Sequence, residues 1–473
     1  MINSDTKNIL YTSTTLKQQS KSKHLKDSLR IQSSKKYKDI HRTTKRGHKI
    51  FNNIIYQFVT DFLNQIAKSI DVESLQIVEL PFQNWDSDDQ EMNDNPFIPE
   101  IVRDAYNQNH NKKKRTFIIT DGRRELTVRF LDSHTEFSTN DHFINLFYRF
   151  LAVTTLIGPD KESVTLTFYP SPFRKELPKK ETTKDHSSSG KTLETNDTLT
   201  FQPKNVNSGF TYHGQPHSIY IYREEEFPKV FVHEMMHALD RDSPNCIKST
   251  KYSLCEWKNL QRDMLETFRV SVVTDRNANQ LLFSETYAET WATIINAILT
   301  LETTNLLFQS SSQGNGQPPT IPKVHLKRII QNLENEKVWA VKQAARILKL
   351  SGFSNLQEFF VDNKFNHSQL NVSEGSDIQK RPHDESNMLI QHTAVFEYYI
   401  LRSAVLFQLE TFINCCYFDN CVENDKTKFT VSIALDVLQN NKKYRRLLNQ
   451  YIAQKGILRQ KTMKMTHTKI SSF

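Results

Sequence analysis

The stretch Val232-His233-Glu234-Met235-Met236-His237-Ala238-Leu239 contains two histidines four residues apart, with a glutamate directly after the first. Four residues are slightly more than one helical turn, so on a helix both imidazoles project from one face. Such a pair can share a zinc ion, with Glu234 beside it as a proton acceptor. The sequence therefore predicts a metal-binding helix. The alternative is two histidines that are satisfied by partners in an ordinary core.

The residues before this motif favour a strand and then a buried helix. Residues 218–223 read as a β-strand, and residues 224–228 read as a helix start because three acidic side chains precede a proline in the first turn. The apolar residues that follow cover several helix faces and are typical of burial: Phe227, Val230, Phe231, Met235, Ala238 and Leu239. Two histidines and a glutamate on a buried helix need partners, and metal coordination supplies them together.

A zinc site needs a third protein ligand, and the sequence restricts its identity. The long motif HExxHxxGxxH is absent, because Asp240 and Ser243 occupy the positions of its Gly and last His. Residues 283–292 are the best source of a ligand. Their apolar members recur at helical spacing, which predicts a helix with Glu285 and Glu289 together on another face.

Glu285 and Glu289 repel each other on a helix by roughly 0.2–0.5 kcal/mol, because like charges four residues apart are neighbours. Neither has a Lys or Arg three or four residues away. A cation from elsewhere would explain the pair, and zinc is the simplest choice. One carboxylate would ligate the metal, and the other would accept the Nδ1 proton of a ligating histidine. The alternative is two glutamates on a solvated helix face.

The stretch Glu285-Thr286-Tyr287-Ala288-Glu289-Thr290-Trp291-Ala292, together with the HExxH motif, resembles the zinc peptidases with a glutamate ligand, the gluzincins. It is most similar to the anthrax-lethal-factor-like branch, whose ligand helix reads E-x-F-A-E-x-F-A. The resemblance covers about residues 218–300. It implies a zincin-like core, a Zn²⁺ ion held by His233, His237 and Glu285, and Glu234 as general base. It also implies that Glu289 supports a histidine and that the substrate is a polypeptide.

The donor that would stabilise an oxyanion is not at the position that this resemblance implies. That branch places a Tyr shortly before the ligand glutamate, but residues 274–284 contain none. We therefore expect the donor elsewhere in the chain, although a Tyr near a helix is more often a packing residue. The candidates are Tyr398 and Tyr399 on the C-terminal helix, Tyr212 or His213 near the strand, and Tyr287.

A second resemblance is to uncharacterised HExxH proteins of large DNA viruses. It rests on residues 205–211, the strand, the two motifs and residues 397–399. It implies a viral protein, and one that is associated with the virion. It also supports a rival hypothesis, a catalytically silent structural or virion protein that retains a zincin fold. The presence of Glu234 argues against this rival, because a purely structural metal site does not need that residue.

Charge is concentrated at the two ends of the sequence. Residues 1–50 hold thirteen Lys/Arg and three Asp, residues 441–473 hold nine Lys/Arg and no acid, and the whole chain carries +9, so the part between is acidic. The first segment is rich in Lys, Ser, Thr and Gln, which predicts disorder. Basic ends of this kind can bind nucleic acid or an anionic lipid surface; the alternative is a solubilising or nuclear-targeting tail.

The remaining composition predicts an intracellular, cytoplasmic protein that is not secreted. We find neither a signal peptide nor a transmembrane stretch, since the most apolar region, residues 393–418, is interrupted by charges. The five cysteines are odd in number and lack paired metal-ligand spacing, which predicts free or buried thiols in a reducing compartment. They are Cys246, Cys255, Cys415, Cys416 and Cys421.

The order of predicted elements indicates an α+β fold with a mixed sheet, an active-site helix and a mostly helical C-terminal part. The predicted parts are a basic tail over 1–50, an α+β part over 51–217, zinc-site helices over 218–300, a helical part over 301–452 and a basic tail over 453–473. We expect helices over 51–66, 142–156, 324–333, 337–350, 392–418 and 431–452, strands over 75–82 and 164–169, a hairpin of 116–120 with 126–130, and loops over 179–200, 309–320 and 363–386. Strand 164–169 or 218–222 is the predicted sheet edge for an extended peptide.

Overall fold

The computed structural model of the chain describes residues 47–69, 74–81, 86–109, 113–132, 149–154, 156–157, 163–178, 199–212, 217–242, 251–273, 280–311, 321–361, 387–419, 425–459 and 462–468. The chain divides into Met1–Ile55 and Tyr56–Phe473, and every element from β1 onward belongs to the second unit. The helix expected over 51–66 lies within α2 (Gly47–Ser69). The predicted loop 363–386, most of loops 179–200 and 309–320, and most of helix 142–156 lie outside the described residues.

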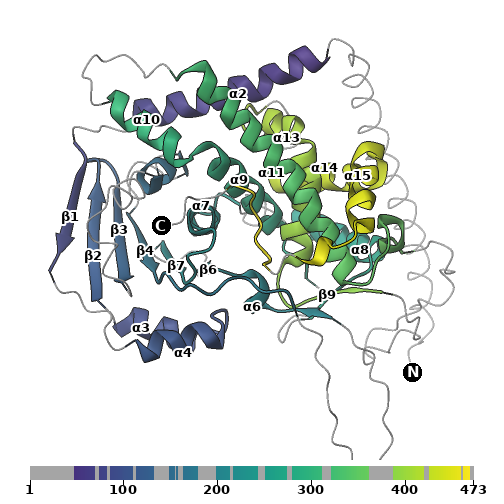
Figure 1. The fold of residues 1–473 in the computed structure, drawn as a ribbon, viewed down its shortest axis with the longest axis horizontal. Coiled ribbons are helices and arrows are strands. Elements are labelled where there is room, and N and C mark those ends of the chain that lie inside the picture. The colour runs from purple at the N-terminus through teal and green to yellow at the C-terminus, as the bar shows by residue number, and fades with distance from the viewer. Residues whose placement is uncertain are drawn as a thin grey trace, which may run out of the picture. The chain divides into compact units, whose positions relative to one another are not determined.

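The main sheet is mixed and has six strands in the order β1-β2-β3-β4-β7-β6 (Figure 1). The first three form the antiparallel part, which contains the expected hairpin, whereas β3, β4 and β7 run parallel and β6 is antiparallel to β7. The α+β prediction is confirmed at this level. The strands are β1 (Gln76–Leu80), β2 (Lys113–Thr120), β3 (Glu125–Asp132), β4 (Ser163–Phe168), β6 (Gly209–Thr211) and β7 (Ser218–Ile221).

The prediction of the sheet edge was wrong. Both expected strands, β4 and β7, are interior, and β6 is the edge strand next to them. A strand of three residues is too short to show an alternating pattern, so β6 could not be predicted from periodicity. Gly209 allows β6 to approach closely: a Cβ there would meet the Tyr220 carbonyl oxygen at 2.8 Å and Val230 Cγ1 at 3.0 Å.

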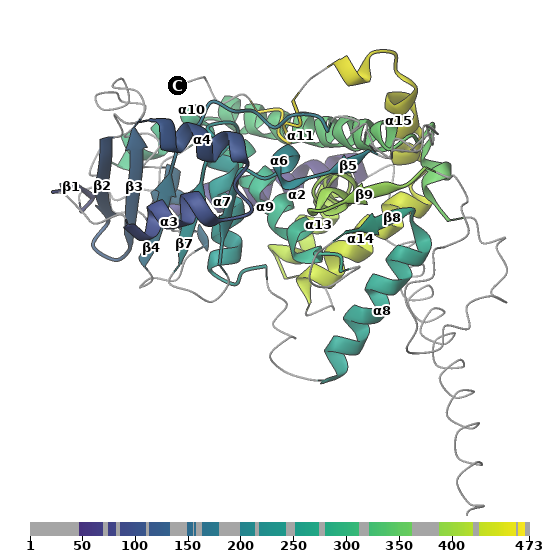
Figure 2. The ribbon, with the colours of Figure 1, turned by 90° about the horizontal axis from the view of Figure 1, so that it is seen from below.

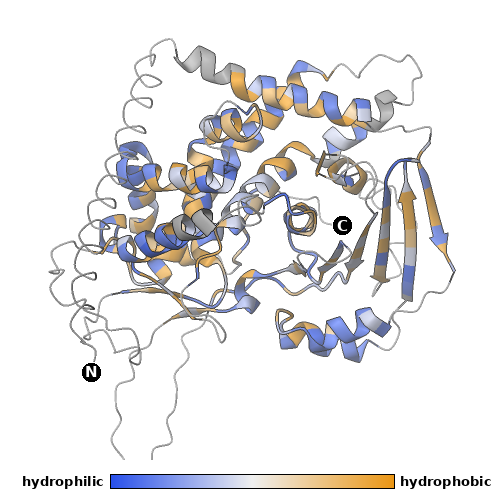
Figure 3. Cartoon of the chain, turned by 180° about the vertical axis from the view of Figure 1, so that it is seen from behind, coloured by the Kyte–Doolittle hydropathy of each residue, from blue (hydrophilic) through white to orange (hydrophobic). Residues whose placement is uncertain are grey.

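The two faces of the sheet carry different helices. On one face α7 (Phe227–Ala238) packs on β6 and β7, and the Phe227 ring stacks on Phe168 of β4 at 3.8 Å. On the other face lie α3 (Asp86–Asp94) and α4 (Glu100–Gln108), which form a core with Tyr220 and Tyr222 of the β7 region (Figure 1). Figure 3 shows that α7 is largely hydrophobic, whereas α3 and α4 are largely hydrophilic, as expected for a buried helix and a covering pair.

The C-terminal part is mostly helical, as predicted, and surrounds α9 (Phe283–Ile298). This helix contacts α7, α11, α12, α14 and the π-helical η5. Burial on nearly every face matches its apolar sequence. The remaining elements are α6 (Pro203–Val206), α8 (Lys251–Thr267), α10 (Leu301–Ser311), α11 (Lys323–Leu350), η3 (Leu356–Phe359), η5 (Phe396–Leu401), α12 (Arg402–Phe407), α13 (Leu409–Cys416), α14 (Lys426–Asn440), α15 (Lys442–Ala453) and η6 (Ile457–Arg459).

Three of the expected helical regions have other boundaries than predicted. The expected helix 392–418 consists of η5, α12 and α13. The expected helices 324–333 and 337–350 form the single long helix α11, because residues 334–336 contain neither Gly nor Pro to end it (Figure 2). The expected helix 431–452 is instead divided into α14 and α15 at Asn441. The side chain of Asn441 accepts a hydrogen bond from the Tyr444 main chain, so it caps the second helix.

The segment 462–468 also differs from the predicted basic tail over 453–473. Its residues Met463, Met465 and Thr466 are buried, and Thr462 pairs with Glu176 in an antiparallel bridge. The segment carries buried Met residues that alternate with polar ones, whereas net charge alone predicted a tail. A small sheet of β5 (Thr200–Phe201), β9 (Leu389–Gln391) and β8 (Val270–Val272) was not predicted.

The prediction of free thiols was wrong at one position. Cys415 is disulfide-bonded, whereas Cys416 is free and buried. An odd number of cysteines and their spacing along the chain do not report which of them meet in space, so the sequence did not reveal this bond. Among the helices that the structure describes, none is both long and apolar enough to span a bilayer.

Candidate metal centre

The ends of α7 fix the direction of the motif helix. At its start, Glu226 adopts a left-handed conformation with φ of 63°, and Pro228 occupies the first turn. At its end, Asp240 is also left-handed, with φ of 51°, and the Arg241 N–H donates to the Met236 carbonyl at 2.8 Å. This is a Schellman-type turn, which reverses the chain directly after the second histidine. The turn brings Asp242 back against α7.

Three ligand atoms converge between α7 and α9. The Nε2 atoms of His233 and His237 lie 3.0 Å apart, and Glu285 Oε2 lies 3.1 Å from the first and 3.2 Å from the second. A tetrahedral zinc site with bonds of about 2.0–2.1 Å has ligand-to-ligand edges of about 3.3 Å. The three observed edges are close to this length. His233, His237 and Glu285 therefore form a group that could hold a metal ion.

Each histidine has a carboxylate on its other ring nitrogen. His233 Nδ1 lies 3.1 Å from Glu289 Oε2, and His237 Nδ1 lies 2.6 Å from Asp242 Oδ2. The hydrogen bond to Asp242 fixes the tautomer of His237 with the proton on Nδ1, so its Nε2 lone pair faces the ligand group. At His233 the Glu289 carboxylate lies close to Nδ1 but without hydrogen-bond geometry among the described residues. The structure places Asp242 behind His237, on the side away from the ligand group.

Charge balance also fits a divalent cation. Four carboxylates surround the two imidazoles, those of Glu234, Asp242, Glu285 and Glu289. Two protein cations, Lys229 and Arg402, both contact Glu289. Two negative charges remain if the imidazoles are neutral, and a buried uncompensated charge is costly. A Zn²⁺ ion would supply the two missing positive charges. Burial would lower the pKa of His237, but Glu285 and Asp242 together raise it well above its usual value.

Two protein cations contact Glu289 and offset its repulsion with Glu285. Lys229 Nζ lies 2.5 Å and an Arg402 guanidinium nitrogen 2.9 Å from Glu289 Oε1. Burial opposes the ionisation of Glu289, but Lys229, His233 and Arg402 together lower its pKa far below the usual range. Glu289 therefore has its own protein cations, whereas Glu285 faces the two histidines.

Glu234 has a different environment. It is buried on α7, and no hydrogen bond or ion pair involves its carboxylate within the described part of the chain. Burial raises its pKa, although both histidines act in the opposite direction. A buried carboxylate without a protein partner is available to bind water or a substrate proton.

Tyr398 is the predicted tyrosine that the structure places beside the ligand group. Its ring packs edge-on against His233 at 5.6 Å, and it is partly exposed. Burial, and then repulsion from and hydrogen bonding to the Glu285 carboxylate, raise the pKa of Tyr398 well above its usual value, so its hydroxyl stays protonated. It lies on η5, where the Arg402 N–H donates to the carbonyl of Glu397, five residues earlier. Such π-turns are frequent at functional sites.

The other predicted tyrosines lie elsewhere. Tyr399 donates to the Met463 carbonyl oxygen at 2.6 Å, Tyr212 donates to Glu91 at the sheet edge, and Tyr287 packs on Trp291 and Phe412. His213 lies outside the described residues. None of the three described alternatives contacts the ligand group through an interaction in the structure.

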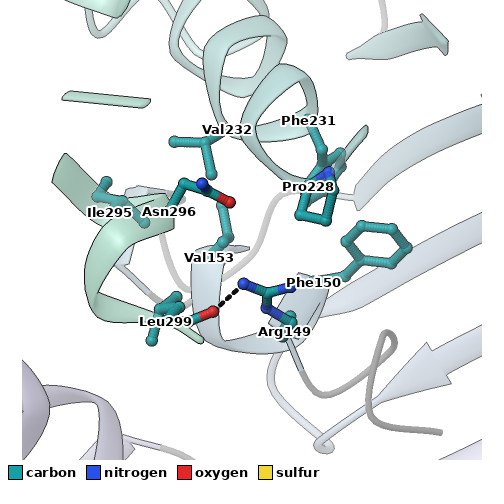
Figure 4. A pocket seen from close by; sticks show the side chains of 9 residues that line it. All are labelled: Arg149, Phe150, Val153, Pro228, Phe231, Val232, Ile295, Asn296 and Leu299. Carbon is teal, nitrogen blue, oxygen red and sulfur yellow. Dashed lines mark hydrogen bonds between the residues drawn. The ribbon is translucent and has the colours of Figure 1, made fainter. Parts of the chain in front are cut away.

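A small cavity lies at the other end of the α7–α9 contact (Figure 4). Its volume is about 10 Å³, close to the minimum for one water molecule. Arg149 lines it and donates to the Leu299 carbonyl at the end of α9, and the buried amide of Asn296 has no hydrogen-bond partner. No residue of the ligand group lines this cavity, so it is separate from the metal centre.

Comparisons with protein-family models, with curated proteins and with solved structures found no match to this chain. The resemblance to gluzincins, and that to viral HExxH proteins, therefore rest on the residues quoted above. The structure adds a buried His233/His237/Glu285 triad beside a mixed sheet.

Proposed function

We propose that this chain is a zinc metallopeptidase with a zincin-like core. In this proposal His233, His237 and Glu285 hold Zn²⁺, Glu234 is the general base, and Glu289 and Asp242 orient the two histidines. A zinc ion at this site would lower the pKa of water toward about 7 and polarise a carbonyl group. The converging ligand atoms and the remaining charge of the site support the choice of a divalent metal.

The unpaired carboxylate of Glu234 carries the catalytic part of the proposal. A structural zinc site has four protein ligands and no need of a buried free carboxylate, whereas a hydrolytic site needs a proton acceptor next to an open position. Glu234 would take a proton from water and pass it to the leaving amine. The protonated hydroxyl of Tyr398 would donate a hydrogen bond to the developing oxyanion.

The edge strand β6 supports a polypeptide substrate. It is antiparallel to β7, has no further strand beside it among the described strands, and packs against the motif helix α7. An extended peptide can add to such an edge through main-chain hydrogen bonds, which suit any sequence. The prediction of strand addition is thus kept, with β6 in place of the two strands expected from the sequence.

Zinc content and the Glu234→Gln variant test this proposal together. The purified protein should contain about one zinc ion per chain and cleave a labelled unstructured polypeptide. Glu234→Gln should retain the zinc, while hydrolysis falls by about 10²–10⁴-fold because the base is lost. As a control, Glu302→Gln on α10 changes an exposed glutamate outside the site and should alter neither quantity.

Three results would contradict the proposal in different ways. A protein purified without chelators that contains no zinc, and takes up none, would exclude the metal centre. Equal hydrolysis by wild type and Glu234→Gln would assign the activity to another source. A wild-type protein with zinc but without hydrolysis would favour the rival hypothesis of a catalytically silent protein with a zincin fold.

A further inference from the structure

A group of buried charges lies behind the three ligand atoms. Lys229 and Arg402 both contact Glu289 Oε1, and all three side chains are at most 1% exposed. One helical turn earlier on α7, Glu226 pairs with Lys175 at 3.0 Å, and both are equally buried. Burial opposes the ionisation of Glu226, but Lys175 and Lys229 help to lower its pKa to about 2. The two pairs therefore form one electrostatic group.

The segment 462–468 crosses this group and contacts it through its main chain. The Thr466 N–H donates to Glu226 at 2.5 Å, and Arg402 donates to the Met465 carbonyl at 3.1 Å. Met465 Sδ lies 3.8 Å from Lys229 Nζ. Four residues hold the segment in place: Lys175 and Tyr399 bind Met463, Arg346 of α11 binds Thr462, and Glu336 of α11 binds residues 466–468.

We propose that Lys229 and Arg402 are positioning residues of the metal centre, and that the segment 462–468 holds Arg402 in place. Both cations bind Oε1 of Glu289, which leaves Oε2 directed at His233 Nδ1. Arg402 is itself fixed by the Met465 carbonyl and by Thr293 Oγ1 at 3.2 Å. A segment that provides no metal ligand thus contributes to metal affinity. This inference rests on the proposed zinc site.

The geometry explains why two cations are needed. A glutamate side chain has three rotatable bonds, and a single contact would leave its carboxylate free to turn. Lys229 on α7 and Arg402 on α12 both donate to Oε1 and hold the carboxylate in one orientation. The conformational entropy of the side chain is therefore lost during folding and not again when a metal binds. A histidine that is oriented in advance binds metal more tightly, and the loss of such a partner typically costs 10- to 100-fold in affinity.

Fold stability alone gives a weaker account of this group. Replacing a buried ion pair by apolar residues of similar size is often neutral or stabilising, because desolvation offsets the Coulomb attraction. Two buried cations around one carboxylate, next to a candidate metal ligand, are better explained by the orientation that they impose. The stability account and the positioning account predict different metal affinities in variants that are equally destabilised.

Lys229→Met and Arg402→Met test the proposal in the full-length protein. Each removes a charge and keeps an unbranched side chain. Zinc affinity is measured by competition with a chromophoric chelator, coordination by the visible spectrum of the Co²⁺-loaded protein, and stability by denaturant unfolding of the metal-free protein. Arg149→Met is the matched control. Arg149 is also a buried arginine, but it donates to the Leu299 carbonyl at the end of α9 and does not contact Glu289.

We expect both variants to bind zinc about 10-fold or more weakly and to shift the Co²⁺ spectrum. In a Glu289→Gln background neither should weaken binding further, since both act through that carboxylate. Arg149→Met should leave the affinity within about twofold, although it lowers stability. Glu336→Ala, which releases residues 466–468 from α11, should weaken zinc by a smaller factor.

Several outcomes would overturn the inference. If the wild-type protein binds zinc and Lys229→Met and Arg402→Met bind it equally well, the inference is wrong. It is also wrong if the affinity losses of these variants add to the loss caused by Glu289→Gln. If Arg149→Met lost as much zinc affinity as Lys229→Met and Arg402→Met, the loss would be explained by general destabilisation of the protein. If either Met variant fails to fold, Arg402→Lys, which keeps the charge but not the two-pronged donor, provides the same comparison. A wild-type protein without any zinc affinity would instead reject the proposed function itself.

Discussion

The contact between α7 and α9 has an open half and a closed half. In the open half, Glu234 has no hydrogen-bond or ion-pair partner among the described residues, Tyr398 is partly exposed and the Glu285 side chain is 15% exposed. In the closed half, one helical turn away, Glu289 is 1% exposed and is bound by two cations. The same pair of helices therefore separates groups that can react from groups that only support, and a spacing of four residues decides which is which.

The largest difference between the halves is expected from two alanine variants. Glu285→Ala should lose zinc almost completely, because it removes a ligand, while the metal-free protein stays folded. Glu289→Ala should weaken zinc by only about 10- to 100-fold. It should however lower the free energy of unfolding by about 3–5 kcal/mol, because two buried cations lose their partner.

Zinc titration and denaturant unfolding of both metal-free variants measure this pattern. The reverse pattern, with zinc lost in Glu289→Ala and stability lost in Glu285→Ala, would show that the two roles have been exchanged. Small effects in both variants would place the third ligand elsewhere.

A fall in pH should destabilise the closed half, because Glu226 becomes protonated and loses its ion pair with Lys175. The folded pKa of this group is about 2, below its ordinary value of 4.5, so its contribution to stability is present above pH 4.5 and is lost as the pH falls toward 2. The shift corresponds to about 3 kcal/mol. We expect the difference in unfolding free energy between wild type and Glu226→Gln to shrink over this interval. A difference that is independent of pH would contradict the assignment.

Asp242→Asn should have a smaller effect than Glu289→Ala and should sharpen the comparison. Asp242 orients His237, but no buried cation depends on it, and its Oδ1 has no partner. Zinc affinity should fall by about 10-fold, and the unfolding free energy by about 1 kcal/mol. Chelator competition and unfolding in parallel measure both values. A stability loss as large as that of Glu289→Ala would mean that the fold depends on Asp242 as much as on Glu289. The difference between the open and the closed half would then not hold.

The smallest effect on the site is expected from the basic N-terminal segment. Deletion of residues 1–49 removes thirteen Lys/Arg and should leave zinc content unchanged. Any nucleic-acid binding should weaken and become less salt-dependent, since fewer counterions are released. Filter binding over a range of salt concentrations measures this. Unchanged binding would exclude the segment as the contact, and loss of zinc would show that these residues belong to the folded body.

The sequence indicated, one helix at a time, the residues of the group that could hold a metal ion. The spacing of His233 and His237, and the apolar stripe of residues 283–295, depend on helical periodicity, which local sequence determines. Glu285 followed from the absence of a third histidine in the motif and from the resemblance. The hairpin at Asp121-Gly122 followed from turn chemistry, and Gly122 indeed has φ of +78°.

The sequence did not predict the partners that come from distant parts of the chain. Lys229 was visible as a charge four residues before His233 in an apolar helix, and Arg402 as a charge that interrupts an apolar region. Each signal indicated a buried cation that needs a partner, but not that both would meet Glu289. The alternation of Met463 and Met465 with polar residues was a signal of burial that net charge concealed.

The π-turn of η5 determines how this part of the chain responds to a change in its length. Residues 396–401 contain one more residue per turn than an α-helix would hold, and the turn carries Tyr398 toward the open half and Arg402 toward the closed half. Deleting one residue here would convert the π-turn into an ordinary α-turn and leave the register of the helix after it nearly unchanged. A deletion further along, in the α-helical part, or an insertion that is not absorbed as a bulge, would instead rotate the residues after it by about 100°. The π-turn is therefore the place in this segment where a change of one residue in length is best absorbed.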